Sequence, residues 1–252
     1  MSSPAPISVQ LYSLRAETAT GMEAVLRRLA GIGYVGVEPA GLGDLSPTRF
    51  REVLDDTGLR LSSAHVGLPV GSTAEAVFDE QDEIGNTVLI SSGRPDEFAS
   101  RDAVARTAEK FNVAAANAAA RGMTIGYHNH WWEFEGLIDG RLPYDLLHEQ
   151  LDPAIIAELD VYWAKVGGVD PSDVVRGLGA RARYLHIKDG PCEPKTPMTA
   201  VGAGTVDIAG VIRSAEAAEW HVVELDECGT DMFTAIEDSY RFLVGEGLSA
   251  GR

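Results

Sequence analysis

Met123-Thr124-Ile125-Gly126-Tyr127-His128-Asn129-His130 is a short apolar run that ends in two histidines. Apolar residues over so few positions predict a buried β-strand, with polar residues where the strand ends. Successive side chains of a strand point to opposite faces, so His128 and His130 lie on one side and Asn129 on the other. The run therefore predicts two imidazoles that face one cavity, with His128 the deeper of the two.

Three later runs have the same organisation. Each is a strand-like apolar stretch that ends in ionisable residues, and they span Ile155 to Asp160, Ala182 to Asp189 and Trp220 to Glu227. Parallel α/β folds place ligands and catalytic groups at the carboxyl ends of their strands. The repetition therefore predicts a parallel sheet whose strand ends form a site.

Strand-like runs alternate with helix-like segments along the whole chain. The expected strands are Ile7 to Tyr12, Tyr34 to Glu38, Leu59 to His65, Thr87 to Ser91, Met123 to His128, Ile155 to Asp160, Ala182 to Lys188 and His221 to Leu225. Ser46-Pro47 and Asp170-Pro171 are typical helix starts, with a capping residue before a proline. Eight such units in about 250 residues predict one α/β domain over residues 1–252, a (β/α)8 TIM barrel. An open doubly wound sheet is disfavoured because Leu11 to Arg15, after the first strand, contains no glycine.

The composition of the chain argues against some classes of binding partner. The chain of 252 residues is 45% hydrophobic and 23% charged, as in soluble globular proteins, and its formal net charge is -17. That charge, without any Lys/Arg cluster, argues against a nucleic-acid partner. The first residues do not resemble a signal peptide, and no apolar run reaches the roughly 18 residues of a membrane span. We expect a cytoplasmic protein with no nucleic-acid or membrane partner.

Four strand-end residues predict a metal site. In a closed barrel, His128, Asp160, His186 and Glu224 would face one another across the mouth. Two imidazoles and two carboxylates suit a divalent metal ion such as Mn²⁺, Co²⁺, Zn²⁺ or Mg²⁺, with positions left for substrate oxygens. The alternative is a network of ion pairs without metal.

Several stretches taken together resemble a known family. They are Val9 to Arg15, Gly33 to Glu38, Ser63 to His65, Tyr127 to His130, Glu158 to Trp163 with Gly168 to Pro171, Leu185 to Asp189, Gly202 to Asp207, and Val223-Glu224. In these the chain resembles the sugar phosphate isomerase/epimerase family with the xylose isomerase-like TIM barrel, over nearly its whole length. Singly, each stretch is a weak signal, and none identifies the substrate.

The resemblance implies a function. Asp160, His186 and Glu224 match the family's metal-ligand positions, whereas His128 stands where the epimerases carry a glutamate. We expect a metal-dependent isomerase or epimerase of a sugar, sugar phosphate or polyol, which removes a proton next to a carbonyl and forms an enediolate. Relatives with the same Tyr-His-Asn-His strand include enzymes suspected of eliminations, so the alternative is a lyase or dehydratase acting on a keto-sugar or keto-inositol. An apurinic-site endonuclease-like enzyme and a catalytically silent sugar-binding barrel are further alternatives.

Individual roles follow from this chemistry. Glu224 is the first choice for the base, and Glu158 is either a second base or a buried ion-pair partner. Lys188 would hold an oxyanion or phosphate and Asp189 would orient it, unless the two form a solvated pair. The other predicted substrate contacts are His65, His130, Glu133 and Trp163 or Trp132, with Glu38 behind them. The partner is a small sugar or polyol, and a homo-oligomer is compatible with the sequence.

Overall fold

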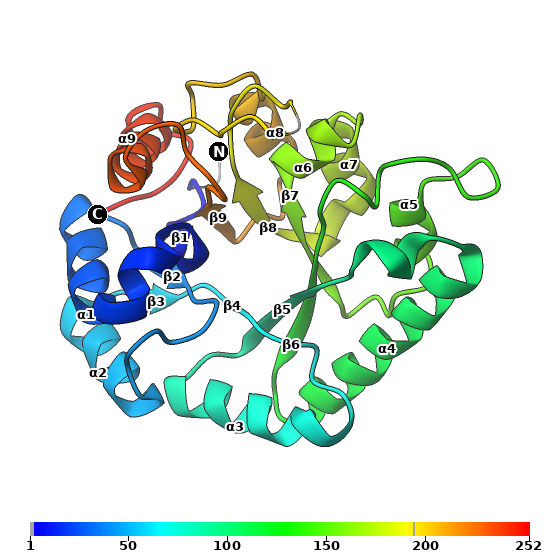
Figure 1. The fold of residues 1–252 in the computed structure, drawn as a ribbon, viewed down its shortest axis with the longest axis horizontal. Coiled ribbons are helices and arrows are strands. Elements are labelled where there is room, and N and C mark those ends of the chain that lie inside the picture. The colour runs from blue at the N-terminus through cyan, green and yellow to red at the C-terminus, as the bar shows by residue number, and fades with distance from the viewer. Residues whose placement is uncertain (1–2, 194) are drawn as a thin grey trace.

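A barrel of parallel strands forms the centre of the computed structural model, which describes residues 3–193 and 195–252, and helices surround it (Figure 1). The strands are β1 (Ile7–Gln10), β2 (Gly36–Glu38), β3 (Arg60–Leu61), β4 (Ala64–His65), β5 (Val88–Ser92), β6 (Thr124–His128), β7 (Ile156–Asp160), β8 (Ala182–Ile187) and β9 (Trp220–Val223). They pair in the order β3-β2-β1-β9-β8-β7-β6-β5-β4. The predicted fold class, an α/β TIM barrel, is confirmed.

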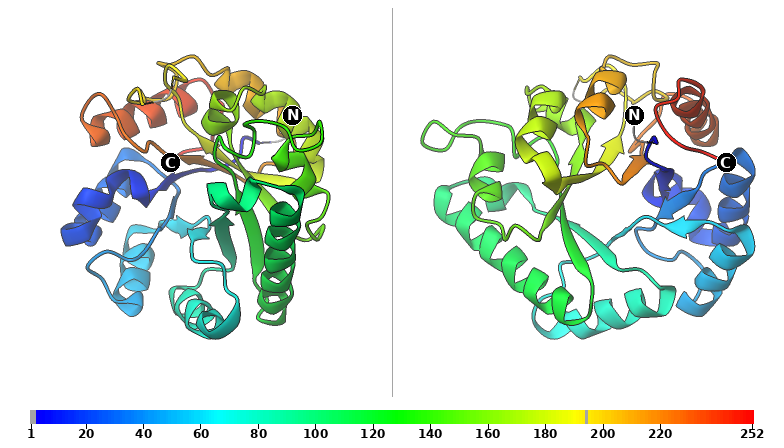
Figure 2. Two further views of the ribbon diagram at one scale, coloured as in Figure 1. Left: turned by 45° about the vertical axis from the view of Figure 1, so that its right-hand side comes forward. Right: turned by 180° about the vertical axis from the view of Figure 1, so that it is seen from behind.

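The helices form a ring outside the strands, which Figure 2 shows from two further directions. They are α1 (Arg15–Ile32), α2 (Pro47–Thr57), α3 (Ala74–Ile84), α4 (Arg101–Ala120), α5 (Pro143–His148), α6 (Val161–Val166), α7 (Pro171–Leu178), α8 (Ile208–Ser214) and α9 (Met232–Gly245). Short 3-10 helices cover Leu11–Leu14, Gly71–Thr73, Pro95–Phe98 and Gly179–Arg181. Both predicted capping residues act as expected, since Ser46 accepts from the Arg49 amide and Asp170 from the Ser172 amide. Within the described residues, no helix has both the length and the apolar character that crossing a membrane requires.

The third expected strand is divided in two. Instead of one strand from Leu59 to His65, β3 pairs with β2, and β4 pairs with β5. The chain bends at Ser62 and Ser63 between them, and this β3–β4 bend closes the barrel. The first strand is also shorter than expected, because a 3-10 helix begins at Leu11.

The barrel interior changes from apolar to polar along the strands. At its amino-terminal end lies a separate apolar cluster of Ile156, Tyr184, Trp220 and Val222. Gly36 makes room for it, because a Cβ at this position would lie 2.7 Å from the Trp220 ring. Two residues further along the same strands stand Glu158, His186 and Glu224. The two-residue period of the strands therefore places a polar layer directly above an apolar floor.

Candidate active site

The polar layer opens into a cavity at the carboxyl ends of the strands. Its volume is about 240 Å³, and it is lined by Tyr12, Ala40, His65, Ser92, His128, His130, Lys188, Glu224 and Asp226. A larger cavity of about 610 Å³ lies between α5 and α7, outside the barrel. Among the described residues, clusters of potential metal ligands occur at the barrel mouth and not beside the larger cavity. The smaller cavity is therefore the candidate active site, because it lies beside the potential metal ligands and the larger cavity does not.

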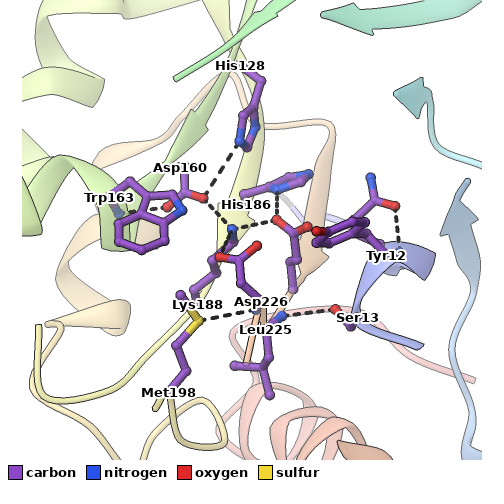
Figure 3. A network of polar contacts seen from close by, with 12 residues as sticks. Tyr12, Ser13, His128, Asp160, Trp163, His186, Lys188, Met198, Leu225 and Asp226 are labelled. Carbon is purple, nitrogen blue, oxygen red and sulfur yellow. Dashed lines mark hydrogen bonds and ion pairs between the residues drawn. The ribbon is translucent and has the colours of Figure 1, made fainter. Parts of the chain in front are cut away.

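The structure brings together the four predicted metal ligands. His128 ends β6, Asp160 ends β7 and His186 lies in β8 (Figure 3). Glu224 directly follows β9. One potential ligand atom from each lies within 4.8 Å of the other three. His128 Nε2 is 3.9 Å from Asp160 Oδ2, and His186 Nδ1 is 2.9 Å from Glu224 Oε2. All four side chains are buried, so this donor set is compact enough for one ion.

Glu158 supports both histidines from below. Its Oε2 lies 3.0 Å from His128 Nδ1 and 3.1 Å from His186 Nε2. With a proton on His128 Nδ1, the lone pair of His128 Nε2 faces Asp160. His186 Nδ1 lies 2.9 Å from Glu224 Oε2, and an ion bound there would replace the proton between these two atoms. A carboxylate behind a histidine in this way orients metal ligands in proteins. Both the four potential ligands and the carboxylate that orients two of them therefore suit a divalent ion.

Glu38 adds a second support. Its Oε1 accepts a hydrogen bond from Gln10 Nε2 at 2.6 Å and lies 2.7 Å from His186 Nε2, while Ser63 Oγ donates to Oε2. The sequence placed Glu38 behind the site, and the structure puts it there, fully buried. Burial raises the pKa of Glu38, and the nearby charge of Glu158 raises it further.

The cluster as a whole favours positive charge. Burial acts to lower the pKa of His186, but Glu158, Glu38 and Glu224 outweigh it and hold this pKa well above its usual value. The carboxylates that stabilise a proton on His186 would equally stabilise a dication beside it. His128 differs, because burial lowers its pKa well below the usual value and keeps the ring neutral, as a metal ligand must be.

Lys188 reaches the same oxygens. Its Nζ is 2.9 Å from Asp160 Oδ2 and 2.8 Å from Asp226 Oδ2 (Figure 3). It is also 2.6 Å from Glu224 Oε2. Burial alone would lower the pKa of Lys188, but the three carboxylates raise it well above its usual value. Of the two earlier alternatives, the solvated Lys-Asp pair is wrong, since Lys188 is buried and Asp189 does not contact it.

Asp189 has a different task from the one expected. Its carboxylate accepts hydrogen bonds from the backbone amides of Gly190, Gly202, Gly204 and Val206, at 2.8 to 3.1 Å. The side chain thus fastens the loop after β8 and points away from the cavity. The prediction that Asp189 binds substrate or orients Lys188 is wrong, because adjacent strand residues point to opposite faces.

The structure also corrects the prediction that Glu133 contacts the substrate. It is fully buried, and its two oxygens accept hydrogen bonds from the Tyr127 hydroxyl at 2.7 Å and the His130 amide at 3.0 Å. It does not line the cavity. Glu133 therefore holds the segment that carries His130 instead of contacting substrate.

The remaining predicted contacts lie at or near the cavity. His65 lines it, but its Nε2 is already 2.7 Å from Glu158 Oε2. His130 lines it too, stacks on Trp132 with ring centroids 4.1 Å apart, and leaves Nδ1 buried without a hydrogen-bond partner in the described part of the chain. Trp163 packs against Trp131 at 4.7 Å and is not a lining residue. Of the expected contacts, His65 and His130 therefore remain in position to meet a ligand.

Four lining residues were not singled out from the sequence, and they are Tyr12, Ala40, Ser92 and Asp226. Asp226 lies two residues after Glu224, so the period of the strand could have placed both on one face. Tyr12 lies two residues after Gln10 on the first strand-like run, and its side chain is 44% exposed at the mouth. The two-residue period of a strand could therefore have predicted that Asp226 and Tyr12 face the cavity.

Comparisons with known proteins agree with this architecture. A sugar phosphate isomerase/epimerase from Parabacteroides distasonis ATCC 8503 is 27% identical, with a TM-score of 0.81 over 96% of this chain and 94% of that one. An L-ribulose 3-epimerase is 17% identical, with a TM-score of 0.72 over 97% of this chain and 94% of that one. A probable 3-DHS dehydratase from Bacillus anthracis is 15% identical, with a TM-score of 0.74 over 95% of this chain and 98% of that one. The last two show the fold alone. Neither a family model nor a curated protein matches the sequence.

The fold and the site define the class of protein. The chain is an α/β TIM barrel with a histidine and carboxylate cluster at its mouth. Its similarity to the Parabacteroides protein confirms the resemblance to sugar phosphate isomerases/epimerases that the motifs indicated.

Proposed function

We propose that this protein is a metal-dependent isomerase or epimerase of a small sugar, which removes a proton from the carbon next to a carbonyl. One observation carries the proposal. Carboxylates hold His128 and His186 from below, so the other nitrogen of each ring converges with Asp160 and Glu224 beside a sugar-sized cavity. The similarity to the Parabacteroides isomerase/epimerase supports the same class.

His128, Asp160, His186 and Glu224 would hold the ion. When bound there, a divalent metal supplies a Lewis acid that polarises a substrate carbonyl and stabilises the negative charge of the enediolate. The donors are nitrogen and oxygen without thiolate, which suits Mn²⁺, Co²⁺, Zn²⁺ or Mg²⁺.

Glu224 is the proposed base. It lines the cavity, whereas Glu158 is fully buried beneath the histidines and is an ion-pair partner. Burial acts to raise the pKa of Glu224, but Lys188 and His186 outweigh it and hold the pKa well below its usual value. The carboxylate is therefore ionised at neutral pH, as a base must be before it accepts a proton.

Lys188 is the proposed proton donor or oxyanion partner. Its ammonium lies 2.6 Å from Glu224 and lines the same cavity. It can therefore donate a hydrogen bond to an oxygen whose charge grows while Glu224 removes the neighbouring proton. His130, with its unpartnered Nδ1 at the cavity, is placed to bind a substrate hydroxyl.

A dehydratase or lyase on a keto-sugar is the second candidate. His128 stands where a second carboxylate would allow proton transfer on both faces of the substrate carbon. An elimination needs one base and one acid, and Glu224 with Lys188 would suffice. The two reactions share the first proton removal and differ in whether a leaving group departs.

The test is solvent deuterium incorporation into a panel of keto-sugars and polyols, with Mn²⁺ present and in its absence. We expect metal-dependent exchange at the carbon next to the carbonyl. An ultraviolet-absorbing enone would assign the elimination, and an exchanged isomer or epimer the leading function. Absence of exchange together with sugar binding would favour the silent barrel. Incision of DNA at an apurinic site would favour the endonuclease, which the acidic mouth argues against.

A further inference from the structure

We infer that the site acts on an uncharged sugar without a phosphate group, of about one monosaccharide unit, and that Asp226 excludes anionic sugars. The inference rests on the proposed function and names the substrate class of the same site. At each place where a phosphate could bind, a carboxylate of the protein already contacts the backbone amides or the cation that the phosphate would need.

The usual phosphate position of this barrel is already filled. In TIM barrels a phosphate often binds to loops after the seventh and eighth strands, through backbone amides. The loop after β8 presents such amides at Gly190, Gly202, Gly204 and Val206, and the buried Asp189 carboxylate accepts from all four. There is no space for a second anion, because even a Cβ at Gly204 would overlap Asp189.

The nearby helix starts are occupied in the same way. Helix amino termini bind phosphate through free backbone amides. Asp160 accepts from the first turn of α6, Asp207 from that of α8, and Asp231 from that of α9, each at 2.8 or 2.9 Å. An aspartate of the chain therefore already takes the place of an anion at each.

Inside the described cavity, the side chains that could pair with an anionic substrate already contact carboxylates of the protein. Lys188, the one lysine or arginine that lines the described cavity, is shared by Asp160, Glu224 and Asp226. His65 lies against Glu158 and, at 3.3 Å, against Glu38. The carboxylates of Asp160 and Glu224 would also offset the charge of a bound dication. A phosphate entering here would meet carboxylates before any free positive charge.

The mouth suits a neutral ring. The volume of about 240 Å³ lies below the roughly 300 Å³ at which pockets for drug-sized ligands begin. Tyr12 offers an aromatic ring at the rim, and the Arg15 guanidinium lies over this ring, 4.4 Å from its centroid. Arg15 also donates to the carbonyl oxygens of Tyr12 and Asp226, at 3.0 and 2.9 Å. Arg15 is thus a cation at the rim that could anchor a phosphate from outside the cavity.

The experiment compares D-allulose and L-ribulose with their terminal phosphate esters on the Mn²⁺-loaded protein. Deuterium incorporation gives kcat/KM for each, and calorimetry gives the binding of each sugar, each ester and inorganic phosphate. We expect exchange and binding for the free sugars and at least tenfold lower kcat/KM for the esters. Equal or faster exchange of an ester would overturn the inference and leave the proposed function standing, and loss of that preference in Arg15→Met would locate the anchor.

Exchange of none of these sugars would count against the proposed function alone. Calorimetry then decides the inference by itself. Free sugar binding more tightly than ester or inorganic phosphate supports it, whereas the reverse order, or no binding of any probe, overturns it.

Asp226→Asn tests the excluding residue. Removing one negative charge at the cavity should raise the ester-to-sugar ratio of kcat/KM by about tenfold, as expected for relief of like-charge repulsion in a partly buried site. Glu227→Gln is the matched control, because it removes the same charge one residue away on an exposed side chain. An unchanged ratio in Asp226→Asn, or an equal rise in Glu227→Gln, would remove Asp226 from the proposal.

Discussion

Glu224 stands between a histidine and a lysine, and its two expected roles can be separated by substitution. Glu224→Gln keeps the volume and one oxygen ligand but removes the base. Deuterium exchange into the substrate should fall by about 10²-fold or more, while metal content stays close to that of the native protein. His186→Ala is the comparison, since it deletes a ligand and should release the metal. Native exchange rates in Glu224→Gln would place the base elsewhere.

Glu158 should matter for metal binding although it is not one of the four proposed metal ligands. Its Oε2 contacts His65, His128 and His186 at once. Glu158→Gln replaces an acceptor with an amide that cannot satisfy three imidazoles, so both ligand rings lose their orientation. Mn²⁺ affinity, measured by calorimetry, should fall by about 10- to 100-fold. Glu149→Gln, an exposed glutamate paired with Arg141, is the control and should leave the affinity unchanged. Equal affinities in the two variants would show that the histidines do not depend on Glu158.

At the scale of elements, the loop after β8 depends on one aspartate. Asp189→Ala leaves the amides of Gly190, Gly202, Gly204 and Val206 without their acceptor. The free energy of unfolding should fall by about 3 kcal/mol, because hydrogen bonds to a charged group contribute about 1.5–3 kcal/mol each and are not additive. Hydrogen exchange at these amides should quicken more than elsewhere.

The matched control for this loop is Asp207→Ala. Asp207 accepts from a single amide at the start of α8, so its loss should cost about 1 kcal/mol. Urea unfolding of both variants supplies the comparison. If Asp189→Ala costs no more than Asp207→Ala, the four hydrogen bonds do not hold the loop.

Strand periodicity predicted which residues meet at the mouth, but not what each one touches. The alternation in β6 to β9 was sufficient to gather His128, Asp160, His186 and Glu224. The place of Asp189 depends on glycines 13 and 15 residues further along the chain, a contact that local patterns do not contain. Glu133 could not be placed either, because its hydroxyl partner Tyr127 lies on the outward face of β6. The β3–β4 bend was missed because Ser62 and Ser63, where the chain bends, include no glycine or proline that would signal a break within Leu59 to His65.

At the scale of the whole molecule, two histidines outside the site should make stability depend on pH: the buried His221, and the partly buried His148, whose ring nitrogens are both buried. Burial lowers the pKa of His148 to about 3, with Arg181 adding to the effect, and lowers the pKa of His221 to about 4. The unfolded chain binds these protons near pH 6.5, whereas the folded chain does not. Stability is therefore complete above pH 6.5 and falls as the pH decreases toward 4.

His148→Phe isolates one of these groups. His148 packs against the Tyr144 ring at 4.3 Å and has no hydrogen-bond partner in the described residues, so phenylalanine can replace its contacts. Urea unfolding between pH 7.5 and 4.5 should show a slope smaller by up to about 1.4 kcal/mol per pH unit. Leu137→Ala, at an exposed position, should keep the native slope. A native slope in His148→Phe would mean that the ring is protonated in the folded state.

The β3–β4 bend links the binding of a ligand at the site to the stability of the barrel where it closes. The strands on either side of it are two residues long, so few backbone hydrogen bonds close the barrel there. Side chains of the site cross the same gap, since Ser63 donates to Glu38 and His65 reaches Glu158. A ligand that orders these side chains must, by thermodynamic linkage, also raise the free energy of local opening in residues 60–65. Amide protection factors in this short segment should therefore rise with ligand concentration along the same isotherm that describes binding.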